Sequence, residues 1–196
     1  MPAGRPLQFD PDVALEAAMQ TFWSRGYEAT ALPDLLAATG LSRSSLYQTF
    51  GSKQALFERC LRRYREDLVG RMRADLAAAP AAFAFLRGVV EGIVDETASD
   101  TRRRGCLMMN TAREFNCRNR AVSKLVAEST TRMAGFFAEV VTQAQAAGDI
   151  PAARDPQAVA LLFLCNVSGL RNLVQARMPR AQVRTTAKQI LETLRA

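Results

Sequence analysis

The residues with the most evident chemical reactivity are four cysteines, one of which follows a run of positive charge. Cys106 stands directly after residues 102–105, which are three arginines and a glycine. Positive charge and the first turn of a helix both favour the thiolate, the form of cysteine that attacks electrophiles. We therefore expect Cys106 to be the most reactive thiol, with Cys117 as its main competitor and with Cys60 and Cys165 buried and slow to react. The alternative is that Cys106 is a small buried residue beside a solvated basic run.

A second group of polar side chains falls within one short segment near the N-terminus. A helix over residues 43–49 would expose the side chains of Arg43, Ser44, Ser45, Tyr47, Gln48 and Thr49. Arginine can bond guanine through two hydrogen bonds, glutamine can read adenine, and hydroxyl groups bind backbone phosphates. Lys53 stands at the start of the next expected helix, where it would face the same anion. These residue types in this order favour a surface that binds double-stranded DNA.

Missing residue types exclude several classes of enzyme. The chain contains no histidine, which excludes a histidine-containing catalytic triad and a zinc site with histidine ligands. The sequence shows no phosphate-binding loop and no cluster of metal ligands. Adjacent carboxylates such as Glu66 and Asp67 diverge on a helix surface and cannot act as a pair. We therefore expect no enzymatic activity, no metal and no cofactor, and a small helical enzyme or carrier is the weaker alternative.

Charge and hydropathy indicate the kind of partner and the location. Of the 196 residues, 26 are basic and 19 acidic, so the net charge is +7. Residues 1–40 carry a net charge of −3 (2 basic, 5 acidic) and residues 41–73 a net charge of +5 (8 basic, 3 acidic), so positive charge begins at the expected DNA-reading helix. The longest apolar stretch, 76–86, has 11 residues, whereas a membrane span needs about 20. We expect a cytoplasmic protein with reduced thiols and no membrane partner.

Helical periodicity dominates the chain, and this predicts an all-α fold. The expected helices cover residues 9–25, 33–39, 43–49, 52–78, 82–98, 105–116, 120–147, 156–177 and 181–195. Pro33 suits a first helical turn and Gly40 suits the left-handed residue after a helix end, while Ser42 and Ser52 can cap the helices that follow. Two short helices joined by a glycine-containing turn form a helix-turn-helix, although taken alone they could be an ordinary corner between helices.

The flanking sequence carries a family resemblance. Residues 22–30 (FWSRGYEAT) and 40–57 (GLSRSSLYQTFGSKQALF) resemble the N-terminal domain of TetR-family transcriptional repressors over about residues 9–60. Ala31 departs from the pattern, since many members carry a helix-capping serine or threonine there. The resemblance implies an all-α homodimer with a DNA-binding domain at 1–60 and an effector-binding and dimerisation domain at 61–196. Residues at family DNA-contact positions are Thr30, Arg43, Ser44, Ser45, Tyr47, Thr49 and Lys53.

Further candidates lie outside this motif. Arg5, in a short arm, could enter a minor groove, although a disordered terminus is as good an interpretation. Apolar and sulfur-containing candidates for an effector pocket are Phe83, Cys106, Met108, Met109, Phe136, Phe137 and Phe163, each of which could equally be plain core. The Gly-Cys-Leu segment at 105–107 resembles that of TetR-type repressors that sense electrophiles or oxidants through a cysteine.

The expected function follows from these elements together. The last two helices are too apolar to remain exposed to solvent. In the family they form the dimer interface, so Leu170 is a candidate interface residue. We expect a repressor that binds a palindromic operator as a dimer and is released by an apolar or electrophilic small molecule, or by modification of Cys106. An activator and a sequence-independent architectural DNA-binding protein are the alternatives.

Overall fold

The computed structural model describes residues 9–100, 103–116 and 118–196, and all regular elements in these ranges are helices. The helices are α1 (Pro11–Arg25), α2 (Leu32–Thr39), α3 (Arg43–Phe50), α4 (Lys53–Ala78), α5 (Ala82–Asp95), the 3-10 helix η1 (Glu96–Ala98), α6 (Leu107–Phe115), α7 (Arg120–Ala146), α8 (Pro156–Gln175) and α9 (Arg180–Arg195). This confirms the all-α expectation, and most boundaries agree with it to within two residues.

Local end signals explain why the helices begin where they do. The Ser42 and Ser52 side chains accept hydrogen bonds from the first-turn amides of α3 and α4, at 3.1 Å in both cases. The Asp155 carboxylate accepts from two amides of α8, and Pro156 follows it at the first helical position. Gly40 ends α2 with a φ of 68°, in the left-handed region that glycine adopts without strain.

The helix expected at 105–116 begins two residues later than the sequence suggests. Gly105 has a φ of 70°, which is incompatible with a right-handed helix, so α6 starts at Leu107. Cys106 therefore occupies the N-cap position, and its side chain makes no capping hydrogen bond. The expected helix at 82–98 is also divided, because α5 ends at Asp95 and η1 completes it.

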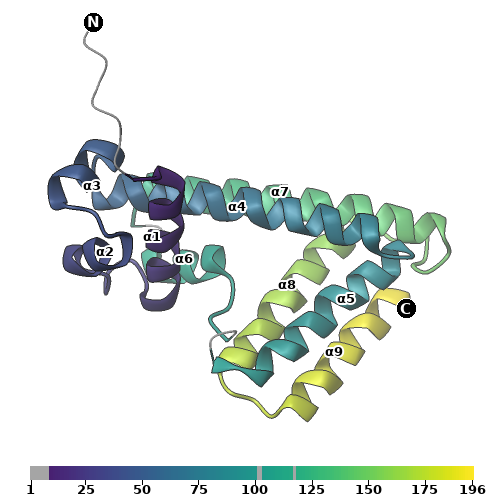
Figure 1. The fold of residues 1–196 in the computed structure, drawn as a ribbon. Coiled ribbons are helices and arrows are strands. Elements are labelled where there is room, and N and C mark those ends of the chain that lie inside the picture. Colours follow the sequence, from purple (N-terminus) through teal and green to yellow (C-terminus); the bar gives the residue numbers. More distant parts are fainter. Residues whose placement is uncertain (1–8, 101–102, 117) are drawn as a thin grey trace, which may run out of the picture.

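The helices form a head and a body joined by two long helices that run side by side, α4 and α7 (Figure 1). The head is the end of the molecule where α1, α2 and α3 surround the start of α4, and α6 lies against it. Its core contains residues of these helices and of early α7, namely Ala14, Ala18, Met19, Phe22, Leu35, Leu41, Leu46, Phe50, Leu56, Phe57, Cys60, Leu61, Tyr64, Leu107, Met108, Phe115, Val122 and Leu125.

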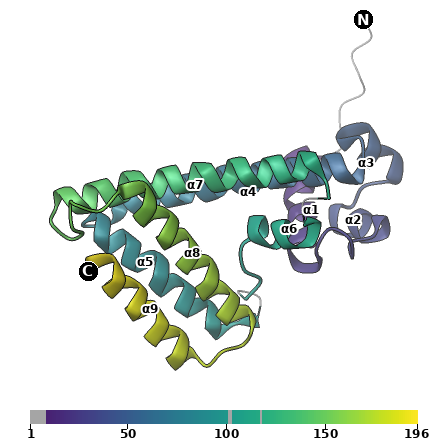
Figure 2. The ribbon, with the colours of Figure 1, turned by 180° about the vertical axis from the view of Figure 1, so that it is seen from behind.

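The body is the other end, where α5, α8 and α9 pack beneath the far halves of α4 and α7, as the view from behind also shows (Figure 2). Its core is a separate cluster formed by α5, α7, α8 and α9. Because α6 and the start of α7 belong to the core of the head, residues from the N-terminal part and from the middle of the chain build it. Helices α4 and α7 therefore contribute side chains to the packing of both the head and the body.

The packing of α8 corrects two expectations. Leu170 faces the core of the body and is 1% exposed, so it is not an interface residue. Cys165 lies on the opposite face of the helix and is exposed, next to Leu161 and Leu162, which are 50% and 38% exposed. The apolar surroundings of Cys165 in the sequence indicated burial wrongly, because they include residues of an uncovered helix face.

The same helix has the length and apolar composition of a membrane span. Among the described residues, α8 alone has both, and a third of that stretch is buried inside the protein. Core helices of water-soluble proteins share these two properties. The exposed part of α8 is thus an apolar surface, and the length and composition of the helix do not identify what covers it.

Candidate DNA interface and effector pocket

The helix-turn-helix consists of α2, a turn at Gly40 and α3, and its apolar residues fix how it presents α3. The Gly40 amide donates to the Leu36 carbonyl at 3.0 Å and closes the end of α2. Leu46 and Phe50 of α3 are buried in the core of the head. These two side chains, one turn apart, hold the apolar face of α3 inward, so that its polar face points to solvent.

The outer surface of α3 carries the residues that the sequence predicts to read DNA. Arg43, Ser44 and Gln48 are exposed, and Tyr47 is 41% exposed. The remaining two predicted residues, Ser45 and Thr49, are half-buried at the edges of this face. All six predicted residues therefore lie on the part of α3 that Leu46 and Phe50 leave outside the core, and the four exposed ones form its outer surface.

Three more predicted DNA contacts have different outcomes. Lys53 begins α4 and is half-buried, with its ammonium 4.3 Å from the centre of the Tyr27 ring. Thr30 is fully buried, and its hydroxyl donates to the Gly26 carbonyl at 2.5 Å. Thr30 is therefore a structural residue of the turn before α2, and its side chain has no surface for a phosphate. Arg5 lies outside the described residues.

A carboxylate from α6 holds the turn between α1 and α2, which sequence reasoning missed. The two oxygens of Glu114 accept hydrogen bonds from the amides of Tyr27, at 2.9 Å, and Glu28, at 2.7 Å. Gly26 stands beside this carboxylate with a φ of 85°, and a Cβ there would come within 3.0 Å of it. The glycine was the only local signal, because backbone amides leave no mark in the sequence.

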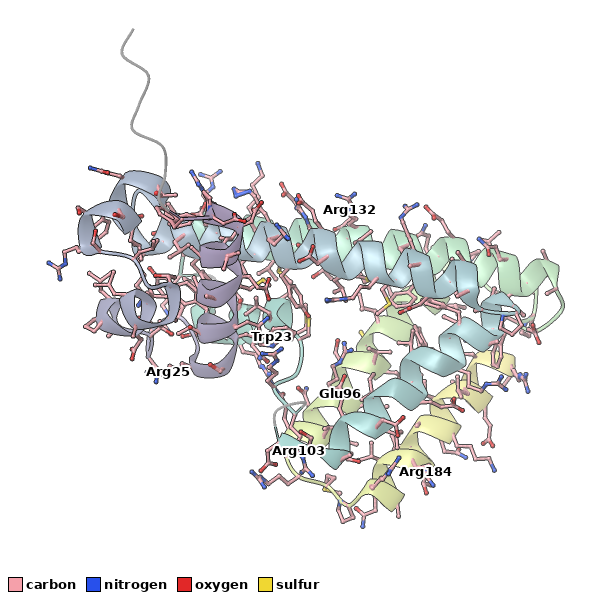
Figure 3. All side chains as sticks on the ribbon, in the orientation of Figure 1. Trp23, Arg25, Glu96, Arg103, Arg132 and Arg184 are labelled. Atoms are coloured by element: carbon pink, nitrogen blue, oxygen red, sulfur yellow. The ribbon has the colours of Figure 1, made fainter. Side chains whose placement is uncertain are left out.

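The loop before α6 also contacts the head. The Trp23 indole donates to the Gly105 carbonyl at 3.1 Å, and the Arg104 guanidinium lies 3.7 Å from the centre of the Trp23 ring. Figure 3 shows Trp23 at the inner side of the head, facing this loop. Arg103 instead donates to the Thr97 carbonyl of η1. The two described arginines before Cys106 are thus both engaged with other groups, while Arg102 lies outside the described residues.

The opposite side of α6 is attached to α8. Arg113 donates to the side-chain oxygens of Asn172, at 3.0 Å, and Gln175, at 3.2 Å. The Gln175 amide also donates to the Arg104 carbonyl at 3.0 Å. Consequently α6 bridges the α1–α2 turn of the head and the C-terminal end of α8 in the body.

A pocket lies between the head and the body, bounded by α4, α5, α6, α7 and α8. Its lining consists of Arg65, Leu68, Met72, Val89, Cys106, Met108, Met109, Ser129, Thr130, Met133, Phe137, Leu164, Val167, Ser168 and Arg171. The cavity has a volume of about 60 Å³. One buried water needs about 10–15 Å³, so the pocket in this arrangement has room for a few waters.

The predicted pocket residues divide into two groups. Cys106, Met108, Met109 and Phe137 line the pocket, as expected. The other three are core residues and do not line it. Phe83 is packed under the Arg195 guanidinium, Phe136 meets Phe85 edge to face, and Phe163 lies behind Phe137 with ring centres 5.0 Å apart. Their helices point them away from the space that α4 and α6 enclose.

The cysteines differ in their access to solvent. Cys60 is fully buried, as predicted, and burial raises the pKa of its thiol, which keeps it protonated. Cys106 is half-buried at the pocket, with its sulfur 3.5 Å from the Tyr64 hydroxyl, which donates to it. Burial raises the pKa of Tyr64, so this donor stays protonated. Cys117 lies outside the described residues.

Comparison with family models covers most of the chain. Residues 14–60 match the model described as "Bacterial regulatory proteins, tetR family". Residues 82–190, more than half of the chain, match "Tetracyclin repressor-like, C-terminal domain". The first range contains the helix-turn-helix, and the second contains most of the body, together with α6.

Individual proteins agree with these matches. The chain is 31% identical over 175 residues to the HTH-type transcriptional repressor ComR of Escherichia coli (strain K12), covering 85% of this chain and 80% of ComR. A cysteine mutant of the TetR family transcriptional regulator CifR, solved with a 26-base-pair operator DNA, is 31% identical, with a TM-score of 0.80 and coverage of 96% of this chain and 98% of that one. A TetR-family regulator from Agrobacterium tumefaciens has the same fold, with a TM-score of 0.83 at 19% identity over 94% of this chain and 97% of that one.

Proposed function

Because the chain belongs to the TetR family of bacterial regulatory proteins, we propose that it is a dimeric repressor that binds a palindromic operator and leaves it when an effector occupies the pocket. Its relatives are transcriptional regulators and not enzymes, in agreement with the missing catalytic residues. The domains proposed are residues 1–60 for DNA binding and 61–196 for effector binding and dimerisation, and the proposed location is the cytoplasm.

The observation that carries this function is the polar outer face of α3. Arg43 is the exposed residue best suited to pair with a base, while Tyr47 and Lys53 suit phosphates. CifR, the relative solved with operator DNA, supports the use of this domain for operator binding. Selection of bound sequences from random DNA tests the proposal, and one enriched palindrome is expected. Enrichment of no sequence would indicate an architectural protein instead.

Two substitutions separate base reading from phosphate binding. Arg43→Ala removes a group that can bond a base edge, so operator affinity should fall by about 1–3 kcal/mol with relaxed specificity at one position per half-site. Lys53→Ala should weaken binding to all sequences alike and reduce the salt slope by about one unit. Fluorescence anisotropy across salt concentrations measures both, and unchanged affinity in both variants would remove the DNA-binding assignment.

The dimer interface is proposed on the exposed apolar face of α8, together with α9. Leu161, Leu162 and Cys165 form this face, and a second copy related by a two-fold axis would cover them. Leu161→Glu should bury an unpaired charge at the interface and give monomers in sedimentation. The control is Val13→Glu, at an exposed apolar residue of α1 in the head, which should leave the dimer intact. A monomeric wild type at micromolar concentration would contradict the proposal.

Release from DNA is proposed to pass through α6. Cys106, Met108 and Met109 present one end of this helix to the pocket, and Glu114 at its other end holds the amides of Tyr27 and Glu28. A ligand that displaces α6 would therefore move the turn that supports the helix-turn-helix. The effector needs to bind one conformation of the dimer more tightly than another that differs in the distance between its two heads. A preference of about 1.4 kcal/mol changes the ratio of the two conformations about tenfold.

Covalent modification of Cys106 is a second proposed route to the same movement. Its sulfur would bond to an electrophilic carbon, as with iodoacetamide, while iodide leaves and the thiol proton passes to water. Timed labelling with limiting reagent, followed by mass spectrometry, should show Cys106 reacting faster than Cys60, which is buried, and Cys165, which the dimer covers. If Cys106 reacts no faster than these two, the cysteine route is excluded and a non-covalent effector remains.

A further inference from the structure

The effector pocket contains polar groups that an apolar ligand would not use. Arg65 reaches it from α4 and Ser129 from α7, and both have buried polar atoms without a hydrogen-bond partner. Buried polar atoms in proteins are almost always paired, since leaving one unpaired costs free energy. Two such atoms in the lining of one pocket indicate a missing partner that accepts hydrogen bonds.

The Arg65 guanidinium carries a charge that the protein only weakly compensates. Its side chain is 18% exposed, and its Nε is buried and unpaired. The nearest carboxylates, those of Glu128 at 3.8 Å and Glu66 at 4.0 Å, are beyond hydrogen-bonding distance and largely in solvent. Exposed pairs at such distances contribute little, so Arg65 remains able to bind a closer anion.

Ser129 differs from its neighbour in how its hydroxyl is used. A serine or threonine inside a helix usually bonds the carbonyl one turn earlier, and the Thr130 hydroxyl does so, donating to Val126 at 2.9 Å. The Ser129 hydroxyl has no partner although the residue is only 7% exposed. It is therefore an unpaired donor in the lining of the pocket that Arg65 also lines.

The remaining lining determines what the rest of the ligand must be. No aspartate or glutamate lines the pocket, within the described residues, and its second arginine, Arg171, is already paired with Glu96 at 3.3 Å. Most other lining residues are apolar, and four of them are methionines, namely Met72, Met108, Met109 and Met133. Methionine side chains adapt to ligands of different shape. The pocket is thus apolar, and Arg65 is the arginine of its lining that has no carboxylate within hydrogen-bonding distance.

We propose that the effector is an organic anion, with a carboxylate headgroup bound by Arg65 and Ser129 and an apolar body lying against the methionines. This rests on the proposed function, because it is the same pocket, and it replaces a purely apolar effector by an amphipathic one. A carboxylate accepts hydrogen bonds from a guanidinium and a hydroxyl together, which satisfies both unpaired atoms.

Calorimetry with three matched probes tests the headgroup. Octanoate, octanamide and octylammonium share one chain and carry a negative, neutral or positive head, and 3-phenylpropanoate with its amide repeats the comparison for a ring. The anions should bind at least about tenfold more tightly than their amides, since hydrogen bonds to charged groups are the stronger ones. Octylammonium should bind most weakly, because Arg65 repels it.

Substitutions in the lining show which residues cause the preference for anions. Arg65→Met keeps the length of the side chain and should reduce octanoate binding to the level of octanamide, whereas Ser129→Ala should weaken octanoate binding severalfold. The control is Arg132→Met, at an exposed arginine that lies on the outer side of α7 in Figure 3 and does not line the pocket. Circular dichroism and operator binding show that each variant is folded.

Two outcomes would overturn the proposal: neither anion binding more tightly than its own amide, or Arg65→Met leaving octanoate affinity unchanged. Binding of the selected operator, measured on the same preparations, distinguishes these from failure of the proposed function. A protein that binds its operator but shows no preference for anions retains the function and loses the effector class. A protein that prefers anions but binds no operator retains the effector class and loses the proposed function.

Discussion

The cores of the head and the body each contain five buried aromatic rings, yet the proposed functional sites of the two regions lie differently relative to these cores. In the head, the rings of Phe22, Tyr27, Phe57 and Phe115 form contacts with centres 4.9–6.0 Å apart, and the proposed DNA-reading surface lies outside them on α3. In the body, four of the five rings pack away from the pocket and Phe137 alone of them lines it, and the proposed effector site is an internal space whose lining includes four methionines. A densely packed core presents a fixed surface, while a methionine-lined space adapts to a guest.

This contrast matches the two tasks that the proposed function assigns to one chain. Reading a groove requires side chains held at constant spacing, so the helix beneath them must not shift. Receiving an effector requires that the protein can change its arrangement at low cost. Helix α6 connects the pocket with the head, since one end of α6 lines the pocket and the other end contacts the α1–α2 turn.

The largest expected effect comes from truncating the centre of the head. Phe57 is 1% exposed and contacts three other rings, so Phe57→Ala should lower the free energy of unfolding by about 3–5 kcal/mol. Met133→Ala in the pocket should cost about 1 kcal/mol, because Met133 is half-buried and already borders a cavity. Urea unfolding measures both, and equal losses would contradict the contrast between a dense head and an adaptable pocket.

The head was also the part that could be predicted from sequence. Its signals are local, since Gly40 and Ser42 mark helix ends through their own backbone and side-chain geometry. The pocket depends on how five helices cross, which no local signal encodes. Phe136 and Phe137 are neighbours on α7, yet only Phe137 lines the pocket. Cys165 was placed wrongly for the same reason, because apolar neighbours in sequence do not reveal which helix face is covered.

The contact between α6 and the α1–α2 turn could not be predicted from the sequence. Substitution of Glu114, which makes this contact, is the second test of the comparison. Its partners are backbone amides 86 and 87 residues away, which any residue type could supply. Glu114→Gln keeps the shape but replaces one accepting oxygen by a donor that faces an amide. Stability should fall by about 1–3 kcal/mol, and the effector should weaken operator binding less than in the wild type.

The matched control for this contact is Glu139→Gln, an exposed carboxylate of α7 to which the structure assigns no ion pair or hydrogen bond. Its stability should change by less than about 0.5 kcal/mol, as is usual for surface substitutions. If the effector shifts operator affinity equally in the Glu114→Gln variant and the wild type, α6 does not transmit the signal. The head and the body would then communicate through α4 and α7 alone.

The smallest expected effect lies at the helix ends, where the head and the body should behave alike. Ser42 caps α3 in the head and Asp155 caps α8 in the body, each by accepting hydrogen bonds from first-turn amides. Ser42→Ala and Asp155→Ala should each lower the free energy of unfolding by about 1 kcal/mol, because the freed amides become solvated. Thermal and urea unfolding of both variants measure this. Similar losses would show that the two regions differ in their cores and not in how their helices begin, whereas a much larger loss for Ser42→Ala would indicate that the α3 cap also supports the packing of the head.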